Sequence, residues 1–242
     1  MKGRLAYTGI TAALVFFAGY AALFLAPDEA TMHAVQRIFY FHVGSWNAMF
    51  CALFVVFFAN VAYLLTRKQK FDALGVSGVE VAVMCCTIGL ITGPLWARPV
   101  WGIWWTWDAR LTSTFILWLL YIAYLLLRGL LEDPEKKASL SAVFGIFAFL
   151  DVPMVYLSNR LWRTQHPQPV ILGGAGSGMA PMIAKVLVLC IVAMFFLMVL
   201  VFIDRYRLEL LRNECEELRF EIESRSAQAQ SLPTSAAQRM NS

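Results

Sequence analysis

The stretch LAYTGITAALVFFAGYAALFLA, residues 5–26, contains 22 consecutive residues without a charged side chain. An α-helix rises about 1.5 Å per residue and the hydrocarbon core of a bilayer is about 30 Å thick, so this run is long enough to cross it. It is longer than the roughly 7–15 apolar residues of a cleaved signal peptide, and Lys2 and Arg4 precede it. We therefore predict a retained first transmembrane helix, although an uncleaved signal anchor would have the same pattern.

Five further apolar runs have a similar length. They cover residues 46–65, 76–95, 113–131, 139–158 and 180–203. The 242-residue chain is 60% hydrophobic and 15% charged, whereas soluble domains are about 45–50% apolar and about 25% charged. The sequence predicts an all-α integral membrane protein, with a bundle of six transmembrane helices within residues 1–204.

The residues after the sixth run have a different pattern. Within 205–225, apolar residues recur at alternating spacings of three and four, which predicts an amphipathic helix able to dock on a partner. These apolar residues are Leu208, Leu211, Cys215, Leu218 and Ile222. The last stretch, 226–242, is polar and predicts a disordered tail.

Basic residues predict the orientation of the six helices, because cytoplasmic loops carry an excess of Lys and Arg. The side with both termini carries Lys2, Arg4, Arg67, Lys68, Lys70, Arg128, Lys136, Lys137, Arg205, Arg207 and Arg212. The other side carries Arg37, Arg98, Arg110, Arg160 and Arg163. We expect cytoplasmic termini and outward-facing loops at 27–45, 96–112 and 159–179.

The second outer loop has an unusual composition. Its sequence WARPVWGIWWTWDARLTS, residues 96–113, places five of the chain's eight Trp within twelve residues. All three histidines, His33, His42 and His166, also lie on the outer side. A flat apolar ligand with a central metal and carboxylates at its edge fits this set, and haem has these properties; imidazole is a standard axial ligand of haem iron.

Each candidate site residue also has an ordinary interpretation. Trp often anchors proteins at the membrane interface, loop histidines are usually solvated, and outer Arg can contact lipid phosphates. Five Trp so close together are poorly explained by anchoring alone. His33 is not accompanied by a comparable cluster of aromatic residues, so we interpret it as an ordinary loop histidine.

Three motifs resemble one known family. WGIWWTWDARLTS at 101–113 resembles the tryptophan-rich WWD signature of haem-handling proteins of cytochrome c biogenesis. QRIFYFHVGSW at 36–46 and RTQHPQP at 163–169 are similar to segments of the cytochrome c maturation protein C family, also called haem exporter protein C. The resemblance covers about residues 30–200. Many relatives have Pro two residues after the first histidine, where this chain has Gly44.

The resemblance implies a site and its residues. Carried over by motif, the two haem-ligating histidines are His42 and His166. The haem platform is Trp101, Trp104, Trp105, Trp107 and Asp108, with Arg98 and Arg110 as candidate propionate contacts. Asp108 has a second interpretation, because it is placed to cap the fourth helix or fix Arg110.

The resemblance also implies a function. It indicates a non-enzymatic chaperone of the bacterial inner membrane, which holds haem b as transient cargo at the periplasmic face. The implied recipient is the periplasmic haem chaperone called maturation protein E, and the resemblance implies that the protein promotes covalent loading of haem onto it. Other implied partners are the ABC transporter of maturation proteins A and B, the single-span protein D and membrane lipid, without nucleic acid.

Two other functions are considered. A small-molecule transporter should show substrate residues at the membrane midplane and often broken helices. A haem electron-transfer protein should carry histidines within its spans, and we expect none there. Within the spans, Asp151 and Lys185 both fall in the outer half, and we predict that they approach each other because unpaired charges in lipid are costly.

Overall fold

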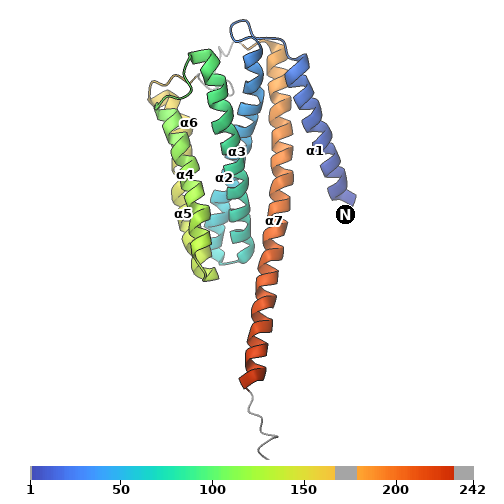
Figure 1. The fold of residues 1–242 in the computed structure, drawn as a ribbon, viewed down its shortest axis with the longest axis vertical. Helices are drawn as coiled ribbons and strands as arrows, with labels where there is room; N and C mark the ends of the chain where they lie inside the picture. The colour runs from blue at the N-terminus through green and yellow to red at the C-terminus, as the bar shows by residue number, and fades with distance from the viewer. Residues whose placement is uncertain (1, 167–178, 232–242) are drawn as a thin grey trace, which may run out of the picture.

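The computed structural model describes residues 2–166 and 179–231, and this part of the chain is almost entirely helical (Figure 1). The elements in chain order are α1 (Lys2–Tyr20), the π-helical turn η1 (Ala21–Leu25), the 3-10 turn η2 (Ala34–Gln36), α2 (Arg37–Thr66), α3 (Gln69–Trp101), α4 (Ala109–Leu130), α5 (Pro134–Phe149), α6 (Asp151–Leu161) and α7 (Pro181–Ser231). The predicted all-α class is confirmed.

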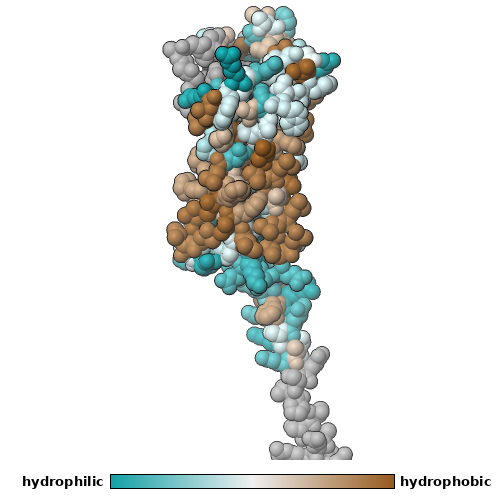
Figure 2. Space-filling view, turned by 90° about the vertical axis from the view of Figure 1, so that its left-hand side faces the viewer, coloured by the Kyte–Doolittle hydropathy of each residue, from teal (hydrophilic) through white to brown (hydrophobic). Residues whose placement is uncertain are grey.

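Six helical stretches are long and apolar enough to cross a membrane, as the six apolar runs predict. They are Lys2–Leu25, Ala34–Thr66, Gln69–Trp101, Ala109–Leu130, Pro134–Leu161 and Pro181–Gln228. Figure 2 shows an apolar band around the middle of the bundle, with hydrophilic residues below it and toward its upper end. A band of this kind is the surface that a lipid-embedded bundle presents.

Helix α2 lies at the centre of the bundle. It packs most extensively on α3 and also contacts α7 and α5, while α1 lies against α7 and α4 lies against α5 and α6. Small residues allow the close approaches: a Cβ on Gly44 of α2 would stand 3.4 Å from the carbonyl oxygen of Cys190 in α7. The absence of a side chain at Gly44 therefore lets α2 and α7 approach each other closely at this point.

The end of the bundle opposite the Trp-rich segment is fastened by ion pairs. Arg128 of α4 donates to both carboxylate oxygens of Asp72 in α3, at 2.6 and 2.9 Å, and lies 3.9 Å from Glu209 of α7. The side chains of Arg128 and Asp72 are only 10% and 8% exposed. Glu80 pairs with Arg205 nearby, so α3, α4 and α7 are held together at this end.

The helices extend beyond the predicted loop boundaries at the Trp-rich end. Residues 37–45 belong to α2, because the face that includes Tyr40, Gly44 and Ser45 is buried. The expectation that no span contains a histidine is therefore wrong: His42 is the sixth residue of α2. Helix α3 likewise continues through Pro94 and Pro99 to Trp101, so the predicted 96–112 loop begins as helix.

The fifth span is divided into two helices. Helix α5 ends at Phe149 and α6 begins at Asp151, two residues before Pro153. Proline lacks an N–H and its ring crowds the carbonyl four residues earlier, here that of Phe149, which explains the break.

The predicted approach of Asp151 and Lys185 is wrong: α6 packs on α4 and α5 whereas α7 packs on α1, α2 and α3. Lys185 is exposed, and Asp151 Oδ2 is buried without a hydrogen-bond partner among the described residues.

Helix α7 is one continuous helix of 51 residues. The segment 205–225 therefore continues the sixth span, and residues 226–231, predicted to be disordered, are helical. The remainder of the predicted disordered tail, 232–242, lies outside the described residues. The apolar stripe of 205–225 is solvent-facing in the described chain, with Leu211 and Ile222 more than half exposed.

Candidate functional site

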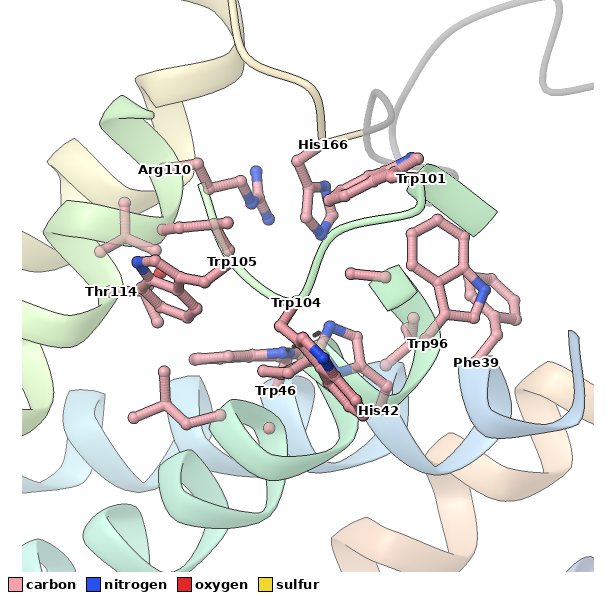
Figure 3. A pocket seen from close by; sticks show the side chains of 18 of the residues that line it. Phe39, His42, Trp46, Trp96, Trp101, Trp104, Trp105, Arg110, Thr114 and His166 are labelled. Carbon is pink, nitrogen blue, oxygen red and sulfur yellow. Dashed lines mark hydrogen bonds between the residues drawn. The ribbon is translucent and has the colours of Figure 1, made fainter. Parts of the chain in front are cut away.

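A cavity opens at the Trp-rich end, between α2, α3, α4, α6 and the segments that follow α3 and α6 (Figure 3). Its walls are mostly aromatic and apolar. The lining includes Phe39, His42, Trp46, Phe50, Trp96, Trp101, Trp104, Trp105, Arg110, Thr114, Tyr156 and His166. Six of the nine predicted site residues are in this set, so the structure brings together segments that are more than 120 residues apart in the sequence.

His42 projects from α2 into the cavity and is held on both sides. Its Nδ1 lies 2.9 Å from Oγ1 of Thr92 in α3, and its Nε2 accepts a hydrogen bond of 2.9 Å from Nε1 of Trp46. Trp46 follows His42 by four residues, so both side chains lie on the same face of α2. The imidazole is thus fixed in direction before any ligand binds.

His166 lies across the cavity from His42. The two ring centres are 6.4 Å apart, with an angle of 29° between the ring planes. An imidazole nitrogen binds a transition metal at about 2 Å and its ring centre lies about 1 Å farther, so two axial histidines have ring centres about 6 Å apart. Figure 3 shows His166 and Arg110 on one side of the cavity, with His42 and Trp46 on the other.

The Trp residues form walls rather than a single flat shelf. Trp96 and Trp101 stand on the last turns of α3 and meet edge to face, with ring centres 5.1 Å apart and planes at 83°. Gly102 then adopts φ +78°, which ends α3 and turns the chain back, and Trp104 and Trp105 follow on the connecting segment. Trp101 also contacts His166 edge to face, with ring centres 6.5 Å apart.

Two predicted platform or propionate residues lie outside the cavity. Trp107 is 74% exposed and packs against Trp105 and Phe115. Arg98 is exposed and donates from Nη1 to the carbonyl oxygen of Gly102, so it caps its own helix. Arg110 differs from Arg98, since it lines the cavity and its buried Nη1 has no hydrogen-bond partner among the described residues.

Asp108 also lies outside the cavity lining, and it joins two segments. Its Oδ1 accepts from the backbone N–H of Leu111 at 2.9 Å, which caps α4. Its Oδ2 accepts from the backbone N–H of Gln165 at 3.2 Å and from Oγ1 of Thr106 at 3.2 Å. The capping interpretation of Asp108 is confirmed, and the second oxygen adds a tie to the residue next to His166.

His33 takes no part in the cavity. It stands in a tight turn with φ +48°, where its backbone N–H donates to the carbonyl oxygen of Glu29 at 2.9 Å. The ordinary interpretation of this histidine agrees with its position.

Trp46, Thr92 and Phe39 were not among the predicted site residues. Trp46 could have been found, because a spacing of four from His42 puts both on one helical face once α2 is known to begin before His42. Thr92 gives no local signal, since its contact with His42 spans 50 residues of sequence.

Comparison with known proteins gives one family. The family described as "Heme exporter protein C" matches residues 2–221. The chain is 30% identical to a protein of that name from Bradyrhizobium diazoefficiens over 204 residues, 84% of this chain and 77% of the relative. It is 29% identical to one from Haemophilus influenzae over 201 residues, 80% of this chain and 79% of the relative. For one from Paracoccus denitrificans the values are 28% over 196 residues, 81% of each chain.

Proposed function

The chain belongs to the haem exporter protein C family, a family of membrane proteins that handle haem in cytochrome c biogenesis, and we propose that it holds haem b as transient cargo in the cavity at its Trp-rich end. His42 and His166 are the proposed axial ligands, one on each face of the iron. The observation that carries this proposal is the 6.4 Å separation of their ring centres across an aromatic cavity.

The other lining residues suit the rest of the cargo. Trp46, Trp96, Trp101, Trp104 and Trp105 offer apolar ring surface for the porphyrin. Arg110 carries a buried guanidinium nitrogen without a partner among the described residues, and Arg binds carboxylates through paired N–H donors. We assign Arg110 to a propionate, and leave Arg98 out of the site because it caps α3 instead.

We propose that the cargo passes to the periplasmic haem chaperone, maturation protein E. The exposed side chains of Trp104 and Trp107, 57% and 74% accessible, mark the face that this partner would approach. In this role the protein positions the cargo and makes no covalent bond to it. The ABC transporter of maturation proteins A and B and the small protein D are the further proposed partners.

The proposed location is the bacterial inner membrane, with the cavity on the periplasmic side. The distribution of Lys and Arg supports this orientation, since the Trp-rich end has few of them and the opposite end has many. Both Arg128 and Arg205, which fasten the helices at the opposite end, follow that rule.

The visible spectrum of the purified protein tests the ligands. We expect wild type, expressed together with its partners, to show a Soret band of six-coordinate low-spin haem, and His42→Ala and His166→Ala each to lose it or shift it to a five-coordinate form. His33→Ala is the matched control and should keep the wild-type spectrum. A wild-type protein without a Soret band, or alanine variants with unchanged spectra, would refute the assignment.

One rival function receives support from the structure. A haem electron-transfer protein would carry a histidine within a helix, and His42 lies within α2. The two functions differ in whether the haem leaves. We expect haem to pass from the protein to added maturation protein E, and haem retained through many redox cycles without transfer would favour electron transfer.

A further inference from the structure

Both ring nitrogens of His42 are already engaged in the structure. Nδ1 faces Oγ1 of Thr92 and Nε2 faces Nε1 of Trp46, each at 2.9 Å. An indole nitrogen can only donate a hydrogen bond, so Nε2 of His42 must accept it and carries no proton. In a neutral imidazole the proton then resides on Nδ1.

The hydroxyl oxygen of Thr92 is placed to accept a hydrogen bond from the N–H at Nδ1 of His42. Its own hydroxyl donates to the carbonyl oxygen of Ile88 at 2.8 Å, one turn earlier in α3. The lone pairs of Oγ1 therefore remain for the N–H at Nδ1 of His42. Three successive hydrogen bonds, from Trp46 to His42 to Thr92 to the backbone, define one tautomer of the ring.

This tautomer is the one that binds metal through Nε2, and Trp46 covers that nitrogen. Trp46 reaches it by lying against α3 at Gly89, where an added Cβ would stand 2.6 Å from Cε2 of the indole. The same lone pair cannot accept the indole N–H and bind iron at once. Before haem binds, the metal-binding nitrogen of His42, Nε2, is therefore occupied by the indole N–H of Trp46.

We propose that Trp46 is a removable cover on the metal-binding nitrogen of His42, and that Thr92 positions the ring in the tautomer that makes Nε2 the ligand. This inference rests on the proposed function, with haem as the cargo. Loading is an exchange: the hydrogen bond from Trp46 to Nε2 breaks and a bond from the Nε2 lone pair to iron forms. No proton or electron is transferred, and the Nδ1–H bond to Thr92 persists through the exchange.

The tautomer can be checked without haem. In the haem-free protein labelled with ¹⁵N-histidine and assigned with His42→Ala, we expect His42 to show a protonated Nδ1 and a bare Nε2. Trp46→Phe should shift the Nε2 resonance, because its donor is lost, and leave Nδ1 protonated. A wild-type ring protonated at Nε2 would overturn the inference.

Haem titration tests the cover. Trp46→Phe keeps an aromatic ring at Gly89 and removes the donor, so we expect ferric haem to bind about two- to tenfold more tightly than to wild type. The matched control is Trp118→Phe, because Trp118 makes a similar 2.9 Å bond from its indole nitrogen to Thr87 away from the cavity and should leave haem affinity unchanged. Equal or weaker haem binding by Trp46→Phe overturns the cover.

Thr92 is tested by removing its acceptor. Thr92→Val should weaken haem binding about tenfold, as other changes to the hydrogen-bond partner of a metal-bound histidine do, and should shift the Nδ1 resonance of His42 in the ¹⁵N spectrum. Thr92→Ser should restore both, and Thr87→Val should change neither. Haem affinity and ¹⁵N signals that are unaltered by Thr92→Val would refute the positioning role.

Haem titration of these variants distinguishes a failure of the proposed function from a failure of the Trp46 cover. If wild type binds no haem, or if His42→Ala leaves haem affinity unchanged, the proposed function fails. If haem binds through His42 but Trp46→Phe and Thr92→Val behave as wild type, the function stands and the cover is wrong.

Discussion

Asp108 accepts a hydrogen bond from the backbone N–H of Gln165, the residue that precedes His166, at 3.2 Å. One carboxylate therefore caps α4 and anchors the segment that carries a proposed iron ligand. Thr164, two residues before His166, donates to Oδ1 of the buried Asn159 at 3.1 Å. The position of His166 thus depends on contacts that the two preceding residues make with α6 and with the N-terminal cap of α4.

Asp108→Asn separates the two tasks of this carboxylate. Asparagine still caps α4 through its single side-chain oxygen, so the stability of the protein should change little, while the Gln165 N–H loses its acceptor. We expect about a threefold to tenfold loss of haem affinity, measured by titration of the Soret band. Asp133→Asn is the control, since Asp133 caps α5 through a 2.8 Å bond from Lys136 far from the cavity. Unchanged haem affinity in Asp108→Asn would show that the tie to Gln165 does not position His166.

Arg110→Gln tests recognition of a propionate. We expect haem to bind about tenfold more weakly, because a charge-assisted hydrogen bond is lost, and haem dimethyl ester to bind the variant and wild type equally. Arg98→Gln should bind both like wild type, since Arg98 caps α3 outside the cavity. Equal weakening for haem and for the ester would indicate that Arg110 supports the fold of the site rather than the propionate.

Gly89→Ala places a methyl group against the indole of Trp46. The added Cβ would stand 2.6 and 2.7 Å from two ring carbons, and a ring packed between helices cannot move as a flexible side chain can. We expect about 1–3 kcal/mol of lost stability in chemical denaturation and a shifted Nε2 resonance of His42. Gly129→Ala on α4, where nothing lies within 4 Å, should instead stabilise by about 0.5–1 kcal/mol. A Gly89→Ala protein as stable as wild type would mean that this contact is not tight.

Asp72→Asn leaves the buried guanidinium of Arg128 without its bidentate partner. Removing one member of a buried ion pair costs about 3–5 kcal/mol, and we expect a loss of this order in the free energy of unfolding. Glu216→Gln removes the exposed partner of Arg212 and should cost less than about 0.5 kcal/mol. The spectrum of bound haem should be unchanged in both variants, because the pair lies at the opposite end of the bundle. A spectral change in Asp72→Asn would contradict this separation.

The six spans were predictable because burying a charged side chain in lipid is costly, so each span must be a stretch of about 20 residues with few charges. Helix ends were not, because they depend on packing and caps. Residues 37–45 are helical since Tyr40 and Gly44 are buried against neighbouring helices, and the break at Leu150 follows from Pro153, which hydropathy does not register.

The site was predictable as a set of residue types but not as a geometry. Motif resemblance identified His42 and His166, and both line the cavity. It also included Arg98, Trp107 and Asp108, which lie outside that lining. Their positions depend on the turn at Gly102 and on the capping of α4, and Thr92 enters the site only through contact between α2 and α3.

Helix α7 has a mechanical consequence for the cavity. At about 1.5 Å per residue its 51 residues form a rod of about 75 Å, more than twice the thickness of the hydrocarbon core. A single helix therefore runs from the exposed tail to the packing beside the cavity. Met194 on α7 lies next to Gly44, two residues from His42, so a displacement of α7 would reach the helix that carries the proposed iron ligand.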